Sequence, residues 1–182
     1  MERILILGSG AGGTMVANNL RKKLSPKQWE VTIIDNDEVH HYQPGWLFIP
    51  FDVYTPEDCQ KPKREFIPEG VNFVLDEVVG IDKETRKVEG KKGKYDYDWL
   101  IIASGCTIVP EEVEGMMDDY GKNIHDFYTL DGAIALRGLV EPAWLERLAA
   151  AVADDMREPG PFYHGYEADG GRFHGNLRLW ET

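Results

Sequence analysis

The residues best suited to chemistry in this sequence are three glycines near its start. Gly8, Gly10 and Gly13 form the pattern G-x-G-x-x-G, with Ser9 and Ala11 among them, between a short apolar run and a helical pattern. The first glycine permits a tight turn, the second lets a pyrophosphate approach the backbone, and the third allows a helix to lie close on a strand. A plain flexible turn also fits these letters, but the flanking patterns favour a phosphate held by the first helical turn. The segment therefore predicts a dinucleotide site.

An acidic residue follows the glycines at the distance that dinucleotide sites use. Asp35 comes 22 residues after Gly13, at the end of a second apolar run, and Asn36 follows it. A carboxylate about 20 residues beyond the glycines hydrogen-bonds the adenosine ribose, whereas the simpler alternative is a turn residue in water. Because a carboxylate disfavours a 2′-phosphate, Asp35 favours FAD or NAD over NADP.

Two sets of histidine and acidic side chains have the residue types of metal ligands. They are Glu38 with His40 and His41, and His164 with Glu167, Asp169 and His174. Neither spacing fits a standard template for zinc or iron, and exposed loops explain both sets. No metal site is predicted.

The glycines and the acid need strands and a helix to position them. Arg3–Leu7 contains a continuous apolar run, which is typical of a strand buried on both faces. Thr14–Leu24 has helical spacing and ends before Pro26, and Val31–Ile34 is a second strand. A strand, a glycine turn, a helix and a strand within about 30 residues make one right-handed βαβ unit.

Later segments decide between FAD and NAD. Residues 36–68 are irregular, where a plain NAD domain would continue with regular βα units. Strand patterns follow at Val71–Leu75, at Val78–Ile81 with Lys87–Val88 as a hairpin, and at Tyr97–Ala103, which we expect to be buried. This order resembles the FAD domain of two-dinucleotide flavoproteins. The sequence thus predicts an α/β fold, a Rossmann-like FAD-binding domain that is incomplete relative to the two-dinucleotide fold, with a short helical and irregular tail.

Charge and composition exclude several classes of partner. The 182 residues carry 20 Lys and Arg against 32 Asp and Glu, a net charge of -12. This balance argues against unassisted binding to nucleic acid or anionic lipid, which need basic surfaces. No segment approaches the roughly 18 apolar residues of a membrane span, and the start lacks the apolar stretch of a signal peptide. With two cysteines and no disulfide scaffold, we expect a soluble protein of the cytoplasm.

Composition changes near residue 140. All eleven lysines lie at or before Lys122, and all twelve isoleucines lie at or before Ile134. We therefore predict an FAD-binding Rossmann-like domain over 1–140 and a tail of uncertain origin over 141–182, with a helix over 142–156 followed by irregular chain. The change in composition indicates either a different origin or a different structural unit for this tail. The alternative is a short helical tail that simply has little use for isoleucine.

Two further segments sharpen the prediction. Tyr42–Gly45 reads Tyr-Gln-Pro-Gly, which is not a general feature of dinucleotide-binding domains, and Ala103–Gly105 reads Ala-Ser-Gly at the end of a strand. Together with the glycine turn, they make residues 1–140 resemble the start of the sulfide:quinone oxidoreductase family, within the pyridine nucleotide-disulfide oxidoreductase superfamily. The resemblance implies FAD as the cofactor, and a small electron donor (sulfide or NADH) and a quinone as partners.

The resemblance also implies which residues hold the FAD. The backbone contact near Val78 and the close approach of Pro44 to the flavin ring rest on the resemblance alone. The residues expected to bind FAD are Gly8, Ser9, Gly10, Ala11, Gly13, Asp35, Asn36, Pro44, Val78, Ala103, Ser104 and Gly105.

Cysteines supply the one candidate catalytic residue. Cys106, directly after Gly105, would face the flavin, and its thiol would receive sulfur or form a charge-transfer contact. A buried small hydrophobic side chain is the interpretation that we favour for it. Cys59 stands among acids, which raise the pKa of a thiol, so we expect no reactivity there.

The second half of the family pattern is missing from this sequence. Family members are longer and add a nicotinamide-type domain, a Gly-Asp return segment, redox cysteines and a membrane-facing quinone site. The tail instead resembles, faintly, the start of phytanoyl-CoA dioxygenase-like proteins, although His164 and His174 lack the His-x-Asp pattern that binds iron. Membrane association through C-terminal elements is therefore not expected.

We expect the FAD-binding portion of a truncated flavoenzyme that passes electrons from sulfide through FAD to a quinone. Two alternatives stay open. The absence of second-half elements favours a non-catalytic dinucleotide-binding module or gene fragment. A small NADH-dependent flavin reductase is the other, and bleaching of bound flavin by NADH would distinguish it.

Overall fold

The computed structural model divides the chain into two compact units, Met1–Ala135 and Leu136–Thr182. The residues that it describes are 1–139, 141–157, 163–168 and 171–176. The division thus falls slightly before the predicted boundary at residue 140. A different origin for the tail stays a prediction.

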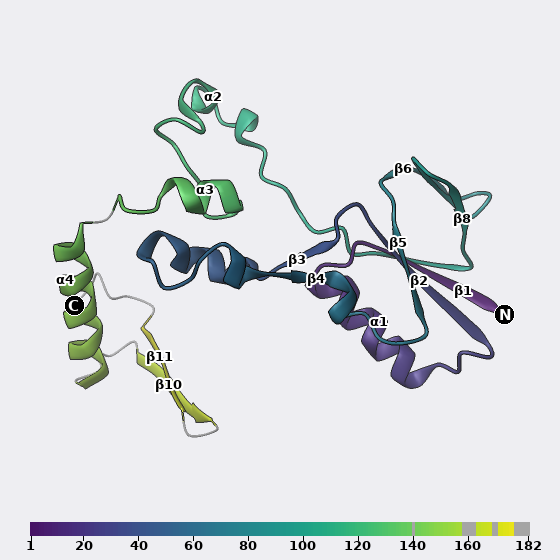
Figure 1. The fold of residues 1–182 in the computed structure, drawn as a ribbon, viewed down its shortest axis with the longest axis horizontal. Helices are drawn as coiled ribbons and strands as arrows, with labels where there is room; N and C mark the ends of the chain where they lie inside the picture. The colour runs from purple at the N-terminus through teal and green to yellow at the C-terminus, as the bar shows by residue number, and fades with distance from the viewer. Residues whose placement is uncertain (140, 158–162, 169–170, 177–182) are drawn as a thin grey trace. The chain divides into compact units, whose positions relative to one another are not determined.

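The largest sheet of the first unit is parallel, with the strand order β5-β2-β1-β9. Figure 1 labels β5, β2 and β1 of this sheet. Its strands are β1 (Glu2–Leu7), β2 (Trp29–Asp35), β5 (Val71–Leu75) and β9 (Trp99–Ile102). Ile6 pairs with Ile33 on one side and with Ile101 on the other. The apolar runs of β1 and β2 follow from this central position, because both faces of these strands are covered. The predicted α/β, Rossmann-like fold is confirmed.

Helix α1 (Ala11–Lys23) covers one face of this sheet. Ala17 is buried against Ile4 and Ile33, and Val16 and Leu20 lie on the same side of the helix. Apolar residues spaced three and four apart on a helix share one side, which explains the pattern that predicted it. The short connection from Leu7 of β1 to Ala11 of α1 places the first turn of the helix at the carboxyl end of that strand.

An antiparallel sheet covers the other face. It comprises β6 (Val78–Asp82), β7 (Lys87–Gly90) and β8 (Lys94–Asp96) in the order β6-β7-β8. Val88 and Tyr97 are buried there against Leu5 and Leu7. Successive side chains of a strand point to opposite faces, so β1 serves both cores, with Ile4 toward α1 and Leu5 toward this sheet.

Strand β9 differs from the buried strand that was predicted. It occupies the edge of the parallel sheet, and Trp99 and Ile102 are 58% and 64% exposed. An apolar run shows that a strand has apolar side chains on both faces, but it does not show that other elements of the same chain cover them. The prediction of burial was therefore wrong, although the strand itself is confirmed.

The segment between β2 and β5, predicted to be irregular, contains five short elements. They are β3 (Val39–His41), η1 (Gln43–Phe51), η2 (Glu57–Cys59), β4 (Gln60–Pro62) and η3 (Lys63–Glu65), where η denotes a 3-10 helix. Strands β3 and β4 pair antiparallel. Strands of three residues and 3-10 helices show no usable period in a sequence, which is why they escaped prediction.

Three further elements follow β9. They are η4 (Pro110–Glu112), α2 (Met116–Asp119) and α3 (Leu130–Ala135). Trp46, Ile49 and Cys59 form a third buried cluster with Ala133 of α3, and Leu130 packs on it. Segments far apart in sequence, η1 and α3, therefore share one small core.

The second unit contains a helix and a hairpin. Helix α4 (Pro142–Arg157) confirms the predicted helix, whereas β10 (Tyr163–Ala168) and β11 (Gly171–Asn176) pair antiparallel where irregular chain was predicted. Glycine and polar residues interrupt the alternation of apolar residues that would have predicted these strands. The dipeptide Asp-Gly in the sequence between them is a hairpin signal that the prediction did not use. In the part of the chain that the structure describes, no helix is both long and apolar enough to cross a membrane.

Candidate functional site

The predicted glycine turn lies at the carboxyl edge of the parallel sheet. Gly8 follows β1 with a φ of +92°, a conformation that glycine adopts without strain, and a Cβ there would overlap the carbonyl group of Ala103. A Cβ on Gly13 would overlap the carbonyl oxygen of Gly8, so α1 begins in direct contact with the end of β1. Both glycines therefore have the geometric roles that the pattern predicts.

Gly10 has different surroundings from the other two glycines. It is the N-cap of α1, and no atom lies within 4 Å of the place that its Cβ would take. No side chain caps this helix in the described structure. The N–H groups of a first helical turn have no partner within the helix and carry the positive end of its dipole. An open helix start of this kind is a cradle for a phosphate anion.

Asp35 lies at the end of β2 and binds the glycine turn directly. Its Oδ2 accepts hydrogen bonds from the backbone N–H of Ser9 at 2.6 Å and from the Ser9 hydroxyl at 2.7 Å. Its Oδ1 accepts the backbone N–H of Asp37 at 3.1 Å. The carboxylate thus holds Ser9, which is fully buried, and fixes the turn to the neighbouring strand.

A lysine that the sequence did not single out completes this arrangement. The ammonium of Lys63, from η3, lies 2.9 Å from Oδ2 of Asp35, and the two side chains are 8% and 10% exposed. Burial works to raise the pKa of Asp35, but the hydrogen bonds from Lys63 and Ser9 outweigh it and hold the pKa below its usual value. Asp35 is therefore an ionised, paired carboxylate beside the glycine turn.

A cavity of about 380 Å³ opens at this edge of the sheet. Five of the predicted residues line it, namely Gly8, Asp35, Asn36, Val78 and Ser104. They come from the ends of β1, β2 and β9 and from the start of β6. The topology therefore brings together residues that are up to about a hundred positions apart in sequence.

Apolar and acidic side chains complete the cavity wall. Ile34, Ile81 and Ile102 give it an apolar surface, whereas Asp76 and Glu77 add oxygen atoms. Such a mixture suits a flat apolar ring with polar edges. The exposed edge strand β9 thus contributes one of its uncovered side chains, Ile102, to a site.

Asp76 is buried but is engaged in structure. Its carboxylate accepts the backbone N–H of Glu77 at 2.8 Å, the backbone N–H of Lys92 at 3.0 Å and the hydroxyl of Tyr95 at 2.7 Å. Burial tends to raise the pKa of Asp76, but these hydrogen bonds lower it below the usual value. Burial and the bond to Asp76 raise the pKa of Tyr95 to about 12. Asp76 therefore ties the antiparallel sheet to the end of β5.

The remaining predicted residues lie outside the cavity wall. Ser9 is a buried residue of the turn itself, Gly10 is the N-cap of α1, and Ala11 and Gly13 lie in its first turn. Ala103 and Gly105 flank Ser104 directly after β9. Pro44 lies at the start of η1 and does not line this cavity.

A pair of hydrogen bonds links the start of η1 to the chain that follows β9. The hydroxyl of Tyr128 donates to the backbone carbonyl of Cys106 at 3.0 Å, and the side-chain amide of Gln43 donates to the carbonyl of Tyr128 at 3.0 Å. Tyr128 therefore connects the Tyr-Gln-Pro-Gly segment to the Ala-Ser-Gly-Cys segment. The sequence patterns did not predict this contact.

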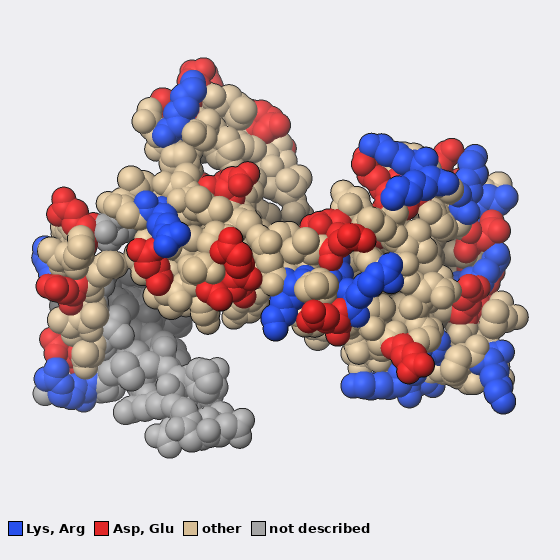
Figure 2. All heavy atoms as spheres, viewed as in Figure 1, with Lys and Arg blue, Asp and Glu red and all other residues tan. Residues whose placement is uncertain are grey.

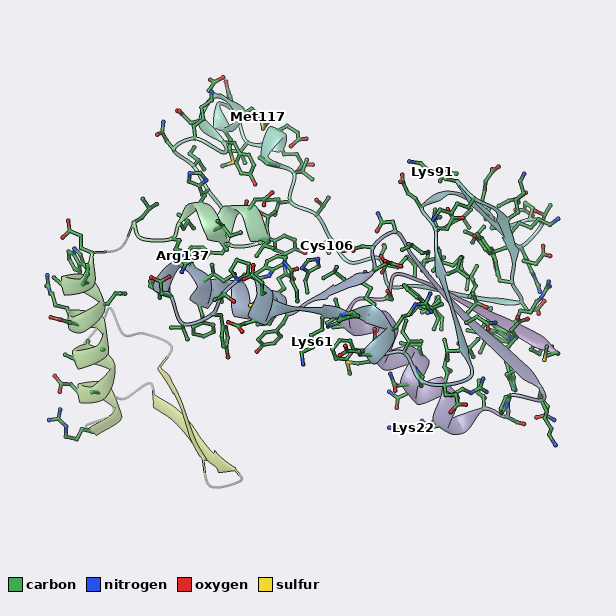
Figure 3. The ribbon with its side chains drawn as sticks, in the orientation of Figure 1. Lys22, Lys61, Lys91, Cys106, Met117 and Arg137 are labelled. Carbon is green, nitrogen blue, oxygen red and sulfur yellow. The ribbon has the colours of Figure 1, made fainter. Side chains whose placement is uncertain are left out.

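The two cysteines have opposite surroundings. Cys106 is exposed in the connection after β9 (Figure 3), so the favoured interpretation of a buried side chain was wrong. Cys59 is 1% exposed, and burial together with Asp58 raises the pKa of its thiol, which fits the expected lack of reactivity. Among the described residues, no group of three or more histidine, cysteine or acidic side chains has the arrangement of a metal site.

The residues at this edge fit an adenine dinucleotide. The open surroundings of Gly10 leave room for a pyrophosphate at the start of α1, and Oδ1 of Asp35, with one donor, keeps capacity for a ribose hydroxyl. On the face drawn in Figure 2, acidic and basic side chains of the first unit are interspersed, without the continuous basic surface that nucleic acids require.

The chain is similar to known oxidoreductases. The family model described as pyridine nucleotide-disulphide oxidoreductase matches residues 2–143. The chain is 35% identical over 124 residues to the mitochondrial sulfide:quinone oxidoreductase of Dictyostelium discoideum, which covers 68% of this chain and 27% of that protein. It is 34% identical over 119 residues to the type II NADH:quinone oxidoreductase of Staphylococcus aureus, covering 64% of this chain and 29% of that protein.

A solved structure shares the fold. The X-ray structure of the sulfide:quinone oxidoreductase from the hyperthermophilic bacterium Aquifex aeolicus aligns with a TM-score of 0.63 at 22% identity, over 82% of this chain and 33% of that one. The chain therefore spans about a third or less of the length of the proteins it matches. The chain belongs to the pyridine nucleotide-disulphide oxidoreductase family of FAD-dependent enzymes, and its first unit is the FAD-binding part of that fold.

Proposed function

We propose that this chain supplies the FAD-binding portion of an oxidoreductase that passes electrons from sulfide to a quinone. The observation that carries the proposal is the joined arrangement of the open helix start at Gly10, the paired Asp35 and the cavity beside them. The similarity to a sulfide:quinone oxidoreductase over 68% of the chain supports the choice of donor and acceptor. The cytoplasmic location of the chain stays a prediction.

Each part of the site has a task in this proposal. The N–H groups around Gly10 and Ala11 bind the pyrophosphate, and Oδ1 of Asp35 accepts a ribose hydroxyl. Ile34, Val78 and Ile102 provide the apolar walls for the adenine ring. When bound, FAD supplies the transfer of two electrons from donor to acceptor, while the protein binds and orients it.

The segments joined by Tyr128 have a task at the other end of the cofactor. Pro44, expected to approach the flavin ring, follows Gln43, and Cys106 is the residue expected to face the flavin. The two hydrogen bonds of Tyr128 therefore link the segments that carry both residues. The exposed thiol of Cys106 lies in the same segment and is accessible to a small donor such as sulfide. Cys106 remains the candidate catalytic residue in this proposal.

A second candidate function uses NADH as the electron donor. The 34% identity to a type II NADH:quinone oxidoreductase supports NADH as the donor. This identity is close to the 35% that supports sulfide. A non-catalytic dinucleotide-binding module is the third candidate, since the chain spans 27% of the first of these relatives. The three candidate functions differ in what reduces the bound flavin. Sulfide reduces it in the first, NADH reduces it in the second, and neither donor reduces it in the non-catalytic module.

Cofactor binding is tested first, by a visible absorbance spectrum of the purified chain after gel filtration and addition of FAD. We expect a flavin spectrum that stays with the protein. Gly10→Val fills the open space at the start of α1 and is expected to weaken FAD binding by about 100-fold, because hydrogen bonds to a charged phosphate are lost. Gly93→Val is the matched control, since Gly93 lies outside the cavity wall. A chain that binds no flavin under any condition would overturn the proposal.

The donor is tested by anaerobic titration of the FAD-loaded chain with sulfide and, separately, with NADH. Bleaching of the flavin by sulfide alone supports the sulfide proposal, and bleaching by NADH alone supports the second candidate. Flavin that neither donor reduces favours the non-catalytic module. Cys106→Ser should slow bleaching by sulfide and leave the spectrum of the bound flavin unchanged.

A further inference from the structure

Lys63 is a charged side chain in a buried position. Its side chain is 8% exposed, although it belongs to a surface segment in which Lys61 and Arg64 are exposed. Burying an ammonium is costly unless the charge is paired and hydrogen-bonded. The fold meets this cost by placing its Nζ 2.9 Å from Oδ2 of Asp35.

The Lys63 contact differs from the other contacts that Asp35 makes. Both Ser9 donors belong to the glycine turn itself, and the Asp37 donor belongs to the chain just after β2. Lys63 comes from η3, where its own backbone N–H donates to the carbonyl of Glu38 at 2.8 Å. Lys63 therefore differs from the Ser9 and Asp37 donors, because it belongs neither to the glycine turn nor to the chain just after β2.

The two oxygens of Asp35 are loaded unequally. Three donors converge on Oδ2, from the Ser9 backbone, the Ser9 hydroxyl and Lys63, while Oδ1 accepts one backbone N–H. A carboxylate oxygen with two lone pairs and one donor still has an acceptor site. Asp35 lines the cavity, and of its two carboxylate oxygens Oδ1 has the fewer donors and so the greater capacity left for a ligand.

The positive charge of Lys63 extends to its other neighbours. His40 lies in β3, and burial, followed by repulsion from Lys63, lowers the pKa of its imidazole. Burial and Lys63 thus both favour the neutral form of the His40 imidazole. The Asp35 carboxylate is paired with Lys63, whose backbone N–H is held by the carbonyl of Glu38.

We propose that Lys63 is a positioning residue that commits Oδ2 of Asp35 to the glycine turn and so directs Oδ1 at the ribose 2′-hydroxyl of the bound dinucleotide. This inference rests on the proposed function, because it presumes that an adenine dinucleotide occupies the cavity. In this proposal, the preference for a ribose over a 2′-deoxyribose ligand depends on the ion pair of Lys63 and Asp35, and not on Asp35 alone.

The test compares ADP with 2′-deoxy-ADP as probes on the full chain, by isothermal titration calorimetry. The wild type should bind ADP about tenfold more tightly than 2′-deoxy-ADP, the factor of one hydrogen bond to a charged group. Lys63→Met keeps the length of the side chain without its charge and should reduce this ratio to about one. Lys63→Arg should restore much of it. Lys61→Met is the matched control, because Lys61 is exposed on β4 and its side chain extends away from the ribbon in Figure 3.

The ratio keeps the test decisive even if Lys63→Met folds less well. Partial loss of the folded state weakens both ligands by the same factor and leaves their ratio unchanged. A Lys63→Met protein that retains the tenfold ratio would overturn the proposal and leave FAD binding standing. Equal binding of both probes by the wild type would also overturn it, while a wild type that binds neither ADP nor FAD would overturn the proposed function as well.

Discussion

The two folded regions of the first unit bury their apolar residues in different ways. The sheet region, residues 2–35 and 71–102, uses continuous runs, and Ile6 and Ile33 are fully buried between two covering layers. The helical region, residues 43–59 and 130–135, buries one small cluster around Ile49 and leaves Phe48 45% exposed. The central strands β1 and β2 bury side chains on both faces of the parallel sheet, whereas the helical region depends on contact between two distant segments. We therefore expect the two regions to differ in stability, with the helical region opening first.

The largest loss of stability is expected from a substitution at Gly13, where α1 lies in direct contact with the end of β1. Gly13→Val places a side chain against the carbonyl oxygen of Gly8, so that α1 cannot lie on the end of β1. We expect a loss of at least about 3 kcal/mol in the free energy of unfolding, seen as a large fall in the urea midpoint. Gly10→Val, three residues earlier in open space, should cost far less, about 1 kcal/mol or less, which is the effect of replacing a glycine at a helix N-cap. Equal destabilisation by both would contradict the assignment of these two glycines.

The second prediction compares matched cavities in the two regions. Ile33→Ala and Ile49→Ala each remove the same atoms from a fully buried site. Ile33→Ala should cost about 3 kcal/mol of global stability. Ile49→Ala should instead raise hydrogen exchange in η1 and α3 and leave β1 and β2 protected, because the helical region opens locally. Loss of protection throughout the unit in Ile49→Ala would show that the regions unfold together.

A smaller effect should follow from breaking the link at Tyr128. Tyr128→Phe removes the hydroxyl that donates to the carbonyl of Cys106. Since Tyr128 is 40% exposed, the loss should be about 1 kcal/mol or less, measured by urea denaturation. Tyr54→Phe, which lies in the helical region and has a similar exposure of 38%, is the control and should have no effect. A larger loss of unfolding free energy in Tyr54→Phe than in Tyr128→Phe would contradict a stabilising role for the hydrogen bond of Tyr128 to Cys106.

The smallest effect concerns acid stability at the other end of the sheet. Hydrogen bonds from the side chain and backbone of Arg3 lower the pKa of Asp98 to about 2, against about 3.9 in an unfolded chain. A lowered pKa contributes stability above the unfolded value and loses it as the pH falls. The stability difference between wild type and Asp98→Asn should therefore shrink as the pH falls from about 4 to about 2. Glu69→Gln, an exposed loop substitution, should show no such trend.

The strands and the glycine turn were predictable because their signals are local. The run Ile4–Leu7, the spacing of Gly8 and Gly13 and the position of Asp35 are each visible within a few residues of sequence. What each strand meets on its faces is not local. That is why the position of β9 was predicted but the exposure of Ile102 was not.

The candidate site divides in the same way. Asp35 was predicted as a ligand for ribose, but its bonds to Ser9 and Lys63 were not, because Lys63 stands in a charged run that looks like an ordinary exposed surface. The exposure of Cys106 was missed for the converse reason, since a cysteine after an apolar strand usually lies buried. Tertiary contacts, not residue types, decide both cases.

The order of the strands has a consequence for how the protein is made. Strand β1 leaves the ribosome first, yet one of its two neighbours is β9, and Arg3 bonds Asp98 across a sequence separation of 95 residues. Until the chain has been translated beyond Ile102, the apolar strand β1 has one open edge. Contacts of such long range slow folding and expose unpaired strands meanwhile. Synthesis rate between β5 and β9 should therefore influence how much of the newly made chain reaches its native state.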